Sequence, residues 1–296
     1  MKKILAALLI ATSFIACNSN DTSSPAPTGG GGGGSTGSVT LAMRLQPGDR
    51  FGYNSLMDID ITSAGMGIRM KMDMGSVFEV TSAGPQGKEL KLTYTRANMS
   101  TKFGMLSTPT MDSMMKKAGE AVMGRSVTIV LSPDNKIVEV KGIDSAYIAA
   151  ADDQTKQVLK SMYSKEQMNS TYGMIFNLYP GKPVKAGDSW DTENDIALSA
   201  VQMKVKTKYT LKEVKDGIAS IGIAGVIDGQ ATMSRGDKVT GMPINGTQNG
   251  TLNVKIGDGY LKDGKIEMEV KAEIETKGMK LPMVIKMNTA LSGNQQ

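Results

Sequence analysis

A long alternation of apolar and charged residues between Met66 and Val80 constrains the fold of this chain more than any other feature. The even positions of this stretch are apolar except Ser76, and the odd positions include Arg69, Lys71 and Asp73. Side chains that repeat every two residues indicate a β-strand with one buried face. Because strands of this kind occur in antiparallel sheets with one solvent-exposed face, the sequence predicts such a sheet.

The same alternation recurs in the second half of the chain, at 203–212, 266–275 and 279–287. Between Ser126 and Val140, Pro133-Asp134-Asn135 predicts the turn of a hairpin, and Asp263-Gly264 predicts a second turn before a strand that begins at Lys265. We therefore expect an α+β domain that is mostly β, built on one or more curved antiparallel sheets.

Two helical segments interrupt the strands. Thr108 is a candidate cap for a helix that begins at Pro109 and ends before Gly124. Ser164 and Gln167 form a capping-box pattern inside a predicted helical segment, 144–176. The apolar positions that support these two helices are Met111, Met114, Met115, Ala118 and Val122 in the first, and Thr155, Val158, Leu159, Met162, Met168, Tyr172 and Ile175 in the second. Such helices are expected to cover one face or one opening of the sheet.

A weak internal repeat predicts two pseudo-equivalent halves, 39–142 and 176–293, joined by the helical segment. Pro47-Gly48-Asp49-Arg50-Phe51 and Ala186-Gly187-Asp188-Ser189-Trp190 each precede a similar succession of strands. The repeat is longer than a solenoid unit, so it suggests a duplicated subdomain. The alternative is that any two successions of antiparallel strands look alike.

The N-terminus has the order of a secretory signal. Lys2 and Lys3 precede an apolar run, 4–15, and Ala16 precedes Cys17, which is the single cysteine of the chain. The run is shorter than the ~20 residues that a membrane-spanning helix needs. We expect a signal peptide over 1–16 and lipidation of Cys17. An ordinary signal peptide with an incidental cysteine is the alternative.

Residues 17–38 predict a flexible tether, because they are rich in Gly, Ser, Thr and Pro and cannot bury enough apolar surface to fold. A single β-rich domain is expected over 39–293, and it has no cysteine left for a disulfide. Removal of Lys2 and Lys3 lowers the formal net charge from +5 to +3. This mild charge does not indicate a nucleic-acid partner.

Several short motifs together resemble the Bacteroidetes-type lipoproteins grouped as domain of unknown function 6263. The motifs are Phe14-Ile15-Ala16-Cys17, Pro47-Gly48-Asp49 with its aromatic Phe51, and Leu178-Tyr179-Pro180 leading into Val184 to Trp190. The resemblance implies an envelope lipoprotein without an established activity. It also implies O-glycosylation at Asp112-Ser113-Met114 and Asp144-Ser145-Ala146.

The sequence offers little for catalysis. Histidine is absent, which excludes Ser-His-Asp and Cys-His catalysis and histidine-ligated zinc. A P-loop or a Rossmann glycine pattern is also missing. A pair of carboxylates would suffice for a glycosidase, and the candidates are Asp58 with Asp60, or Asp191, Glu193 and Asp195. Because these acids alternate along predicted strands, we favour solvated surface charges. We expect no enzyme, cofactor or metal site.

Three further features have two interpretations each. Met70, Met72 and Met74 could bind Cu(I) through their thioethers, but they also fit the apolar face of a strand, where methionine fills a core or lines a plastic cavity. Phe51 and Trp190 could stack on a sugar, although we favour core aromatics. Arg235-Gly236-Asp237 spells an adhesion tripeptide, and we favour a simple turn.

Two functions remain open. The first is a membrane-anchored, non-catalytic envelope lipoprotein that binds an apolar or amphipathic ligand, through residues that the sequence does not identify. The second is a structural module that interacts with another envelope protein. Asn18 after Cys17 lacks an acidic retention signal, which favours the outer membrane over the inner one.

Overall fold

The computed structural model describes residues 37–63, 65–103, 109–142, 156, 163–198, 201–235, 238–276 and 279–296. These residues form a chain of strands with two described helices. The elements are β1 (Arg50–Ser63), β2 (Met66–Gly84), β3 (Gly87–Phe103), α1 (Pro109–Val122), β4 (Ser126–Leu131), β5 (Ile137–Lys141), α4 (Lys165–Asn177), β6 (Ser189–Leu198), β7 (Val201–Lys215), β8 (Ile218–Arg235), β9 (Lys238–Lys255), β10 (Leu261–Thr276) and β11 (Met279–Gln295).

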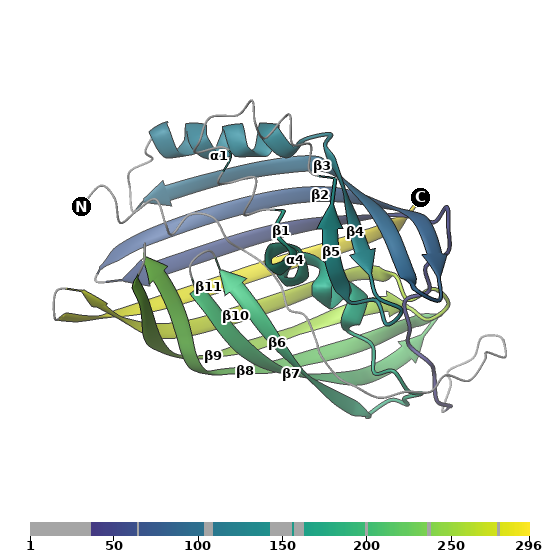
Figure 1. The fold of residues 1–296 in the computed structure, drawn as a ribbon. Helices are drawn as coiled ribbons and strands as arrows, with labels where there is room; N and C mark the ends of the chain where they lie inside the picture. The colour runs from purple at the N-terminus through teal and green to yellow at the C-terminus, as the bar shows by residue number, and fades with distance from the viewer. Residues whose placement is uncertain are drawn as a thin grey trace.

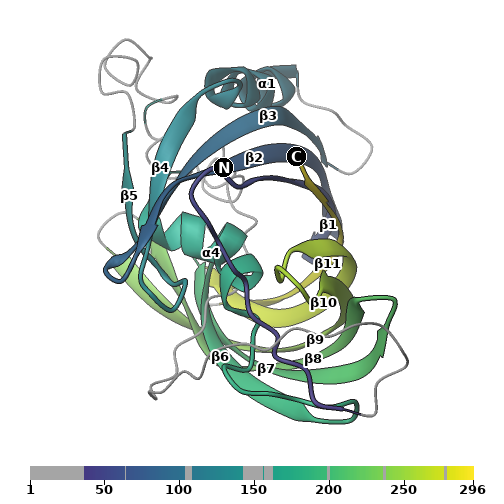
Figure 2. The same cartoon turned by 90° about the vertical axis from the view of Figure 1, so that its right-hand side faces the viewer.

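All strands belong to one antiparallel sheet of 11 strands, in the order β5-β4-β3-β2-β1-β11-β10-β9-β8-β7-β6. The first and last strands pair in the interior of the sheet, so that a meander of five strands and a meander of six meet at β1 and β11. The sheet is strongly curved and α4 lies on its concave side (Figures 1 and 2). It is not closed, because β5 and β6 are edges. The predicted mostly β fold, with a curved antiparallel sheet and helices between strands, is confirmed.

The alternation in β2 separates a concave apolar face from a convex, solvent-exposed face. Phe78 and Met70 are buried on the concave side. Arg69 and Lys71 project from the convex side and pair with Asp60 at 2.6 Å and Asp58 at 3.2 Å on β1. Since each strand has side chains on alternating faces, one buried face fixes the register of the whole strand.

An aromatic cluster fills one end of the curved sheet. The rings of Phe51 and Phe78 are stacked with centroids 5.1 Å apart. Tyr172 and Phe176 of α4 meet Phe78 edge-on, at 5.1 and 5.7 Å. Trp190 is also buried, and its Nε1 donates to the carbonyl of Leu178 at 2.9 Å. The rings at positions 51 and 190 are therefore core aromatics, the interpretation that the sequence favoured.

The two helices protect places where the sheet lacks a neighbouring strand. α4 contacts both β5 and β6, the two edges of the sheet. α1 contacts β3 beyond the six residues, Lys88–Thr93, that pair with β4. Gly119 of α1 allows a close approach, because a Cβ at this position would collide with the carbonyl oxygen of Ala97. Covering an exposed edge in this way prevents it from pairing with another chain.

The predicted helix ends agree with the structure where it describes them. α1 begins at Pro109, and Gly124 adopts a positive φ of 68° just past its end. Ser164 caps α4 by accepting a hydrogen bond from the Gln167 amide at 3.1 Å. The helical positions predicted at Thr155, 157–162 and 144–150 lie outside the described residues, and so do 1–36 with Cys17.

One of the two predicted turns is wrong. Pro133-Asp134-Asn135 does form the turn between β4 and β5, with Asn135 at a φ of 64°. Asp263-Gly264 instead lies within β10, and the chain turns earlier, at 256–260. A Cβ on Gly264 would stand 2.5 Å from Cδ2 of Leu252, so packing on the concave face explains this glycine.

The two strand meanders start with turns of the same geometry. In the first, the Asp49 carboxylate accepts from the Gln46 amide at 2.7 Å, and Gly48 has a φ of 91°. In the second, the Asp188 carboxylate accepts from the Lys185 amide at 2.9 Å, and Gly187 has a φ of 93°. Each turn also forms two backbone hydrogen bonds to a neighbouring strand: Gly48 and Asp49 to Val80, and Gly187 and Asp188 to Leu211.

Candidate functional site

Methionines from five strands lie together on the concave face. Met57 of β1 pairs with Met72 of β2, and Met72 pairs with Met99 of β3. In the adjoining row, Met268 of β10 pairs with Met287 of β11. With two more from β2, these residues form what we call the methionine band: Met57, Met70, Met72, Met74, Met99, Met268 and Met287.

The methionine band is buried at some positions and partly accessible at others. Met57, Met70, Met268 and Met287 are 3 to 5% exposed. Met72, Met74 and Met99 are only half-buried, as are their concave-face neighbours Ile68 and Ile285. The band therefore combines core packing with apolar surface that the chain does not fully cover. On β2 the half-buried positions of this face are Ile68, Met72 and Met74, and Met70 between them is buried.

Truncation of single methionines should separate these two environments. We expect Met70→Ala to lower the free energy of unfolding by about 2–5 kcal/mol, as for other buried large-to-small changes. Met74→Ala should cost roughly half as much or less, because a half-buried side chain loses fewer contacts. Denaturant midpoints of the two variants test this, with Lys71→Ala on the convex face as the control. Equal losses at positions 70 and 74 would contradict the assigned environments.

A polar group interrupts the apolar concave face at β7 to β9. Gln248 of β9 is fully buried, and its Oε1 accepts a hydrogen bond from Oγ1 of Thr207 at 3.3 Å. Gly225 of β8 lies between these two residues in the pairing register. A Cβ on Gly225 would stand 2.9 Å from Cβ of Gln248, so the glycine makes room for this contact.

The concave face carries almost no charge. Among the side chains that the structure describes on this face of β1 to β3 and β7 to β11, the one charged group is Lys88, near the β2–β3 hairpin, where its Nζ donates to the carbonyl oxygen of Pro133 at 3.0 Å. Burial raises the pKa of Tyr53 and Tyr94 above the ordinary tyrosine value, so both phenols stay protonated at neutral pH. At the methionine band, a charged ligand would find no counter-ion among the described side chains of this face.

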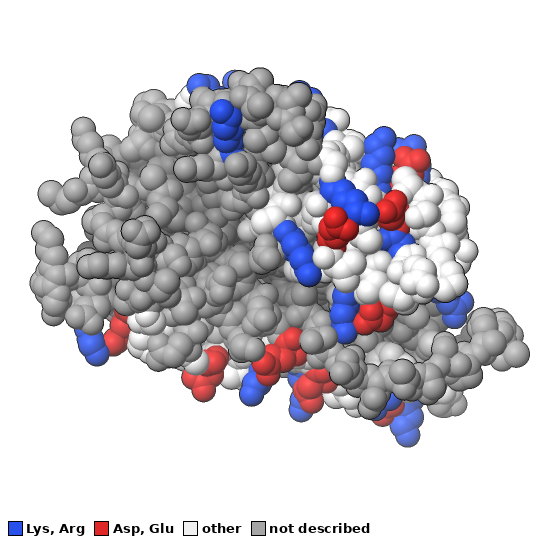
Figure 3. Space-filling model, viewed as in Figure 1, with Lys and Arg blue, Asp and Glu red and all other residues white. Residues whose placement is uncertain are grey.

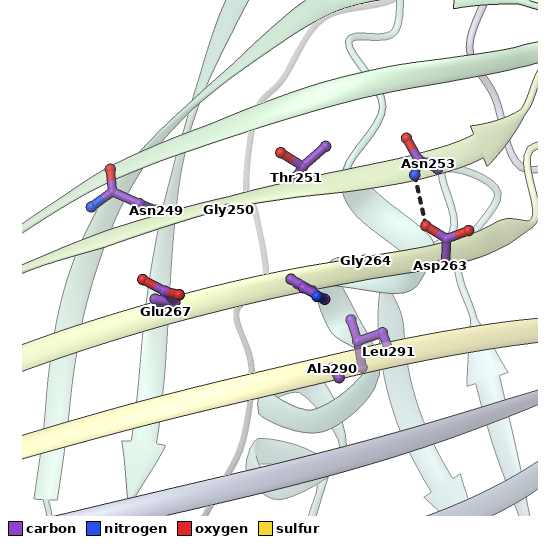
Figure 4. Close-up of a pocket in the computed structure, with 10 residues that line it drawn as sticks. Asn249, Gly250, Thr251, Asn253, Asp263, Gly264, Glu267, Ala290 and Leu291 are labelled. Atoms are coloured by element: carbon purple, nitrogen blue, oxygen red, sulfur yellow. Dashed lines mark hydrogen bonds between the residues drawn. The ribbon is translucent and has the colours of Figure 1, made fainter.

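A separate shallow groove of about 660 Å³ lies on the convex face of β9, β10 and β11 (Figure 4). Its polar side chains include Asn249, Thr251, Lys265 and Glu267, and Asn253 donates to Asp263 at 2.6 Å. The lining contains no aromatic residue. A groove without an aromatic platform or a buried charge has no strong group for recognition, so we regard the concave face as the candidate site.

The acidic residues considered for catalysis do not form a site. Asp58 and Asp60 are convex-face members of ion pairs, about half exposed. Asp191 and Glu193 are exposed on the edge strand β6, opposite Lys208 and Lys206, and the side chain of Asp195 lies outside the described set. Within the described residues, no cluster of His, Cys, Asp and Glu fits a metal ion.

Surface charge and helix length give two further observations. Basic and acidic side chains are intermixed over the described part of the surface in Figure 3, with no basic stripe of the kind that binds nucleic acid. In the described part of the chain, no helix is long and apolar enough to cross a membrane. The glycosylation candidate Ser113 is exposed on α1, whereas Ser145, Gly236 and Asp237 lie outside the described residues.

The chain matches the model of a family of unknown function, DUF6263, over residues 85–261, which is more than half of its length. The chain belongs to the DUF6263 family. The resemblance inferred from the short motifs is thereby confirmed at the level of the family. No curated protein matches this DUF6263 protein.

Solved structures resemble this DUF6263 protein only distantly. A structure of lipid–protein interactions in lipovitellin aligns with a TM-score of 0.48 and 12% identity, covering 86% of this chain and 26% of that one. A COG4313 outer membrane channel from Pseudomonas putida F1 aligns with a TM-score of 0.21 and 6% identity, over 85% and 97% of the two chains. The chain thus spans about a quarter of the lipovitellin chain that it matches.

Proposed function

We propose that this DUF6263 protein is a membrane-anchored, non-catalytic lipoprotein of the cell envelope that holds an apolar or amphipathic ligand on the methionine band. The observation that carries the proposal is the half-buried apolar surface of Met72, Met74 and Met99 on the concave face of a curved sheet. A concave, mostly apolar surface is the usual form of a small-molecule site. Exposed apolar surface of this kind favours a binding role over a purely structural one.

Methionine suits this role chemically. Its unbranched thioether side chain has three rotatable bonds and a polarizable sulfur, so it adapts to ligands of different shape. On the band, the half-buried Met72 lies next to two buried methionines, Met70 on the same face of β2 and Met57 opposite it on β1. A ligand with long acyl chains would find a surface that adjusts to it at low energetic cost.

The proposed anchor is the lipidated Cys17, supported by the basic, apolar and small residues that precede it. Several acyl chains on one cysteine would give stable attachment, at about 0.8 kcal/mol for each buried methylene. Asn18 favours the outer membrane as the location. The tether at 17–38 would let the folded domain move away from the membrane surface.

Native mass spectrometry can test the proposed ligand site. The full chain carrying Cys17→Ser is purified without detergent, and we expect a non-covalent adduct with the mass of an apolar lipid. Met72→Trp, which fills the concave face, should reduce the fraction of protein with this adduct. Lys71→Trp is the matched control, because it places the same ring on the convex face one residue away.

The alternative function is a structural module of the envelope, and the same experiment distinguishes it. Absence of any adduct, together with identical spectra for both tryptophan variants, would contradict ligand binding. Circular dichroism of each variant confirms that the sheet is intact before the spectra are compared.

A further inference from the structure

The concave face holds a buried amide whose hydrogen bonds are incomplete. Gln248 is 0% exposed, and its Oε1 accepts from Oγ1 of Thr207. Its Nε2 meets no acceptor in the part of the chain that the structure describes. Because a buried donor without an acceptor is energetically unfavourable, such groups are rare in proteins and call for an explanation.

Gln248 is enclosed, so an acceptor can reach its Nε2 only when a neighbouring side chain moves. Gly246 and Gly250 flank it on the same face of β9, and the backbone of β10 packs against both glycines. Met268 lies directly opposite in the pairing register, and Met287 lies beyond it. Met268 can change rotamer at little cost, since its side chain has three rotatable bonds. The amide therefore lies at the margin of the methionine band.

A second donor on the same face has the same property. Thr289 of β11 is 4% exposed, and its Oγ1 meets no partner within the described residues. It pairs with Met57, and Ile266 lies between it and Gly250 in the register. Gln248 and Thr289 are two strands apart, which is ~10 Å at the usual strand spacing. Both donors are neutral, and both lie next to methionines of the band.

Charge on the ligand decides which molecules fit these donors. At the methionine band the described side chains of the concave face include no charged group, so a buried carboxylate or ammonium would lose its hydration there without gaining a counter-ion. We propose, on the basis of the proposed function, that the ligand is a neutral acyl ester or amide. Its carbonyl accepts a hydrogen bond from Nε2 of Gln248, and its acyl chain lies along the methionine band.

Three probes with the same chain length test this ligand class. Hexadecane, methyl hexadecanoate and hexadecanoate are delivered from cyclodextrin to the full chain carrying Cys17→Ser, and binding is measured by displacement of a pyrene-labelled hydrocarbon. At pH 8, where a free carboxyl group is ionised, we expect the ester to bind at least tenfold more tightly than the acid. Hexadecane should also bind, because the band is apolar.

The variant Gln248→Met removes the donor while keeping the length of the side chain. We expect it to weaken ester binding about three- to tenfold, which corresponds to one net hydrogen bond, and to change hexadecane binding by less than twofold. Asn249→Met on the convex face is the matched control and should change neither affinity. If Gln248→Met does not fold, Thr289→Val provides a second test of the same kind, with a smaller expected loss.

The outcomes separate the two proposals. Equal weakening of ester and hexadecane by Gln248→Met would mean a structural role for Gln248 and would overturn the assigned ligand class. Tighter binding of hexadecanoate than of the ester would overturn it as well. If none of the three probes binds the protein before Gln248 is changed, the proposed function itself fails.

Discussion

Replacement of Phe78 by Ala is expected to lower the free energy of unfolding by about 3–5 kcal/mol, the usual range for a fully buried phenylalanine. Phe78 is 0% exposed and contacts rings from β1 and α4. Its loss removes two ring contacts between β2 and α4, the helix that contacts both edge strands. Urea titration followed by far-UV circular dichroism measures the change.

Val226→Ala is the control for this prediction. Val226 projects from the convex face of β8 and is 62% exposed, so its truncation should change stability by less than about 0.5 kcal/mol. The indole of Trp190 donates a hydrogen bond to the carbonyl of Leu178, at the end of α4. Fluorescence of Trp190 therefore gives a second readout of helix docking. A stability loss at Phe78 no larger than that at Val226 would show that α4 does not depend on this cluster.

Cys17→Ser should move the protein almost completely from the membrane fraction to the soluble fraction. The expectation follows from the sequence alone, because the serine hydroxyl does not replace the thiol as the site of acylation. Each lost acyl chain removes about 0.8 kcal/mol of membrane affinity for every methylene it buries. Fractionation of cells by ultracentrifugation, with immunodetection of the protein, provides the measurement.

Asn18→Ser is the control, since it leaves the cysteine in place and should keep the protein in the membrane fraction. The urea midpoint of the released Cys17→Ser variant should be unchanged, because Cys17 precedes the predicted start of the domain near Val39. Persistent membrane association of Cys17→Ser would place the anchor elsewhere in the chain.

The faces of the strands were predictable because they depend on local periodicity. In β2 and β10, apolar residues at every second position select one face for the core, and the structure places Met70, Phe78 and Met268 there. The caps at Ser164 and Gly124 were predictable for the same reason, since a helix end depends on a few neighbouring residues. The turn at Asp263-Gly264 was wrong because a glycine in a strand, kept small for packing against Leu252, has the same sequence signature as a glycine in a turn.

The candidate site was only half predictable. The methionines of β2 stood out in the sequence, but Met57 and Met99 join them through the registers of the β1–β2 and β2–β3 hairpins. Met287 joins them through the pairing of β1 with the distant strand β11. Gln248 was missed altogether. A signal for it did exist, because it occupies an apolar-face position between Gly246 and Gly250, but the meaning of that position depends on the register with β8 and β10.

The sequence by itself determined the strand-rich class, the apolar and polar faces of the long strands, and the family resemblance. These properties follow from residue order within one segment. Only the tertiary structure decided that β1 pairs with β11, that α4 lies inside the curve between two unpaired edges, and that methionines from five strands share one surface. Such contacts depend on which distant segments pair, and local periodicity is the same for every possible partner.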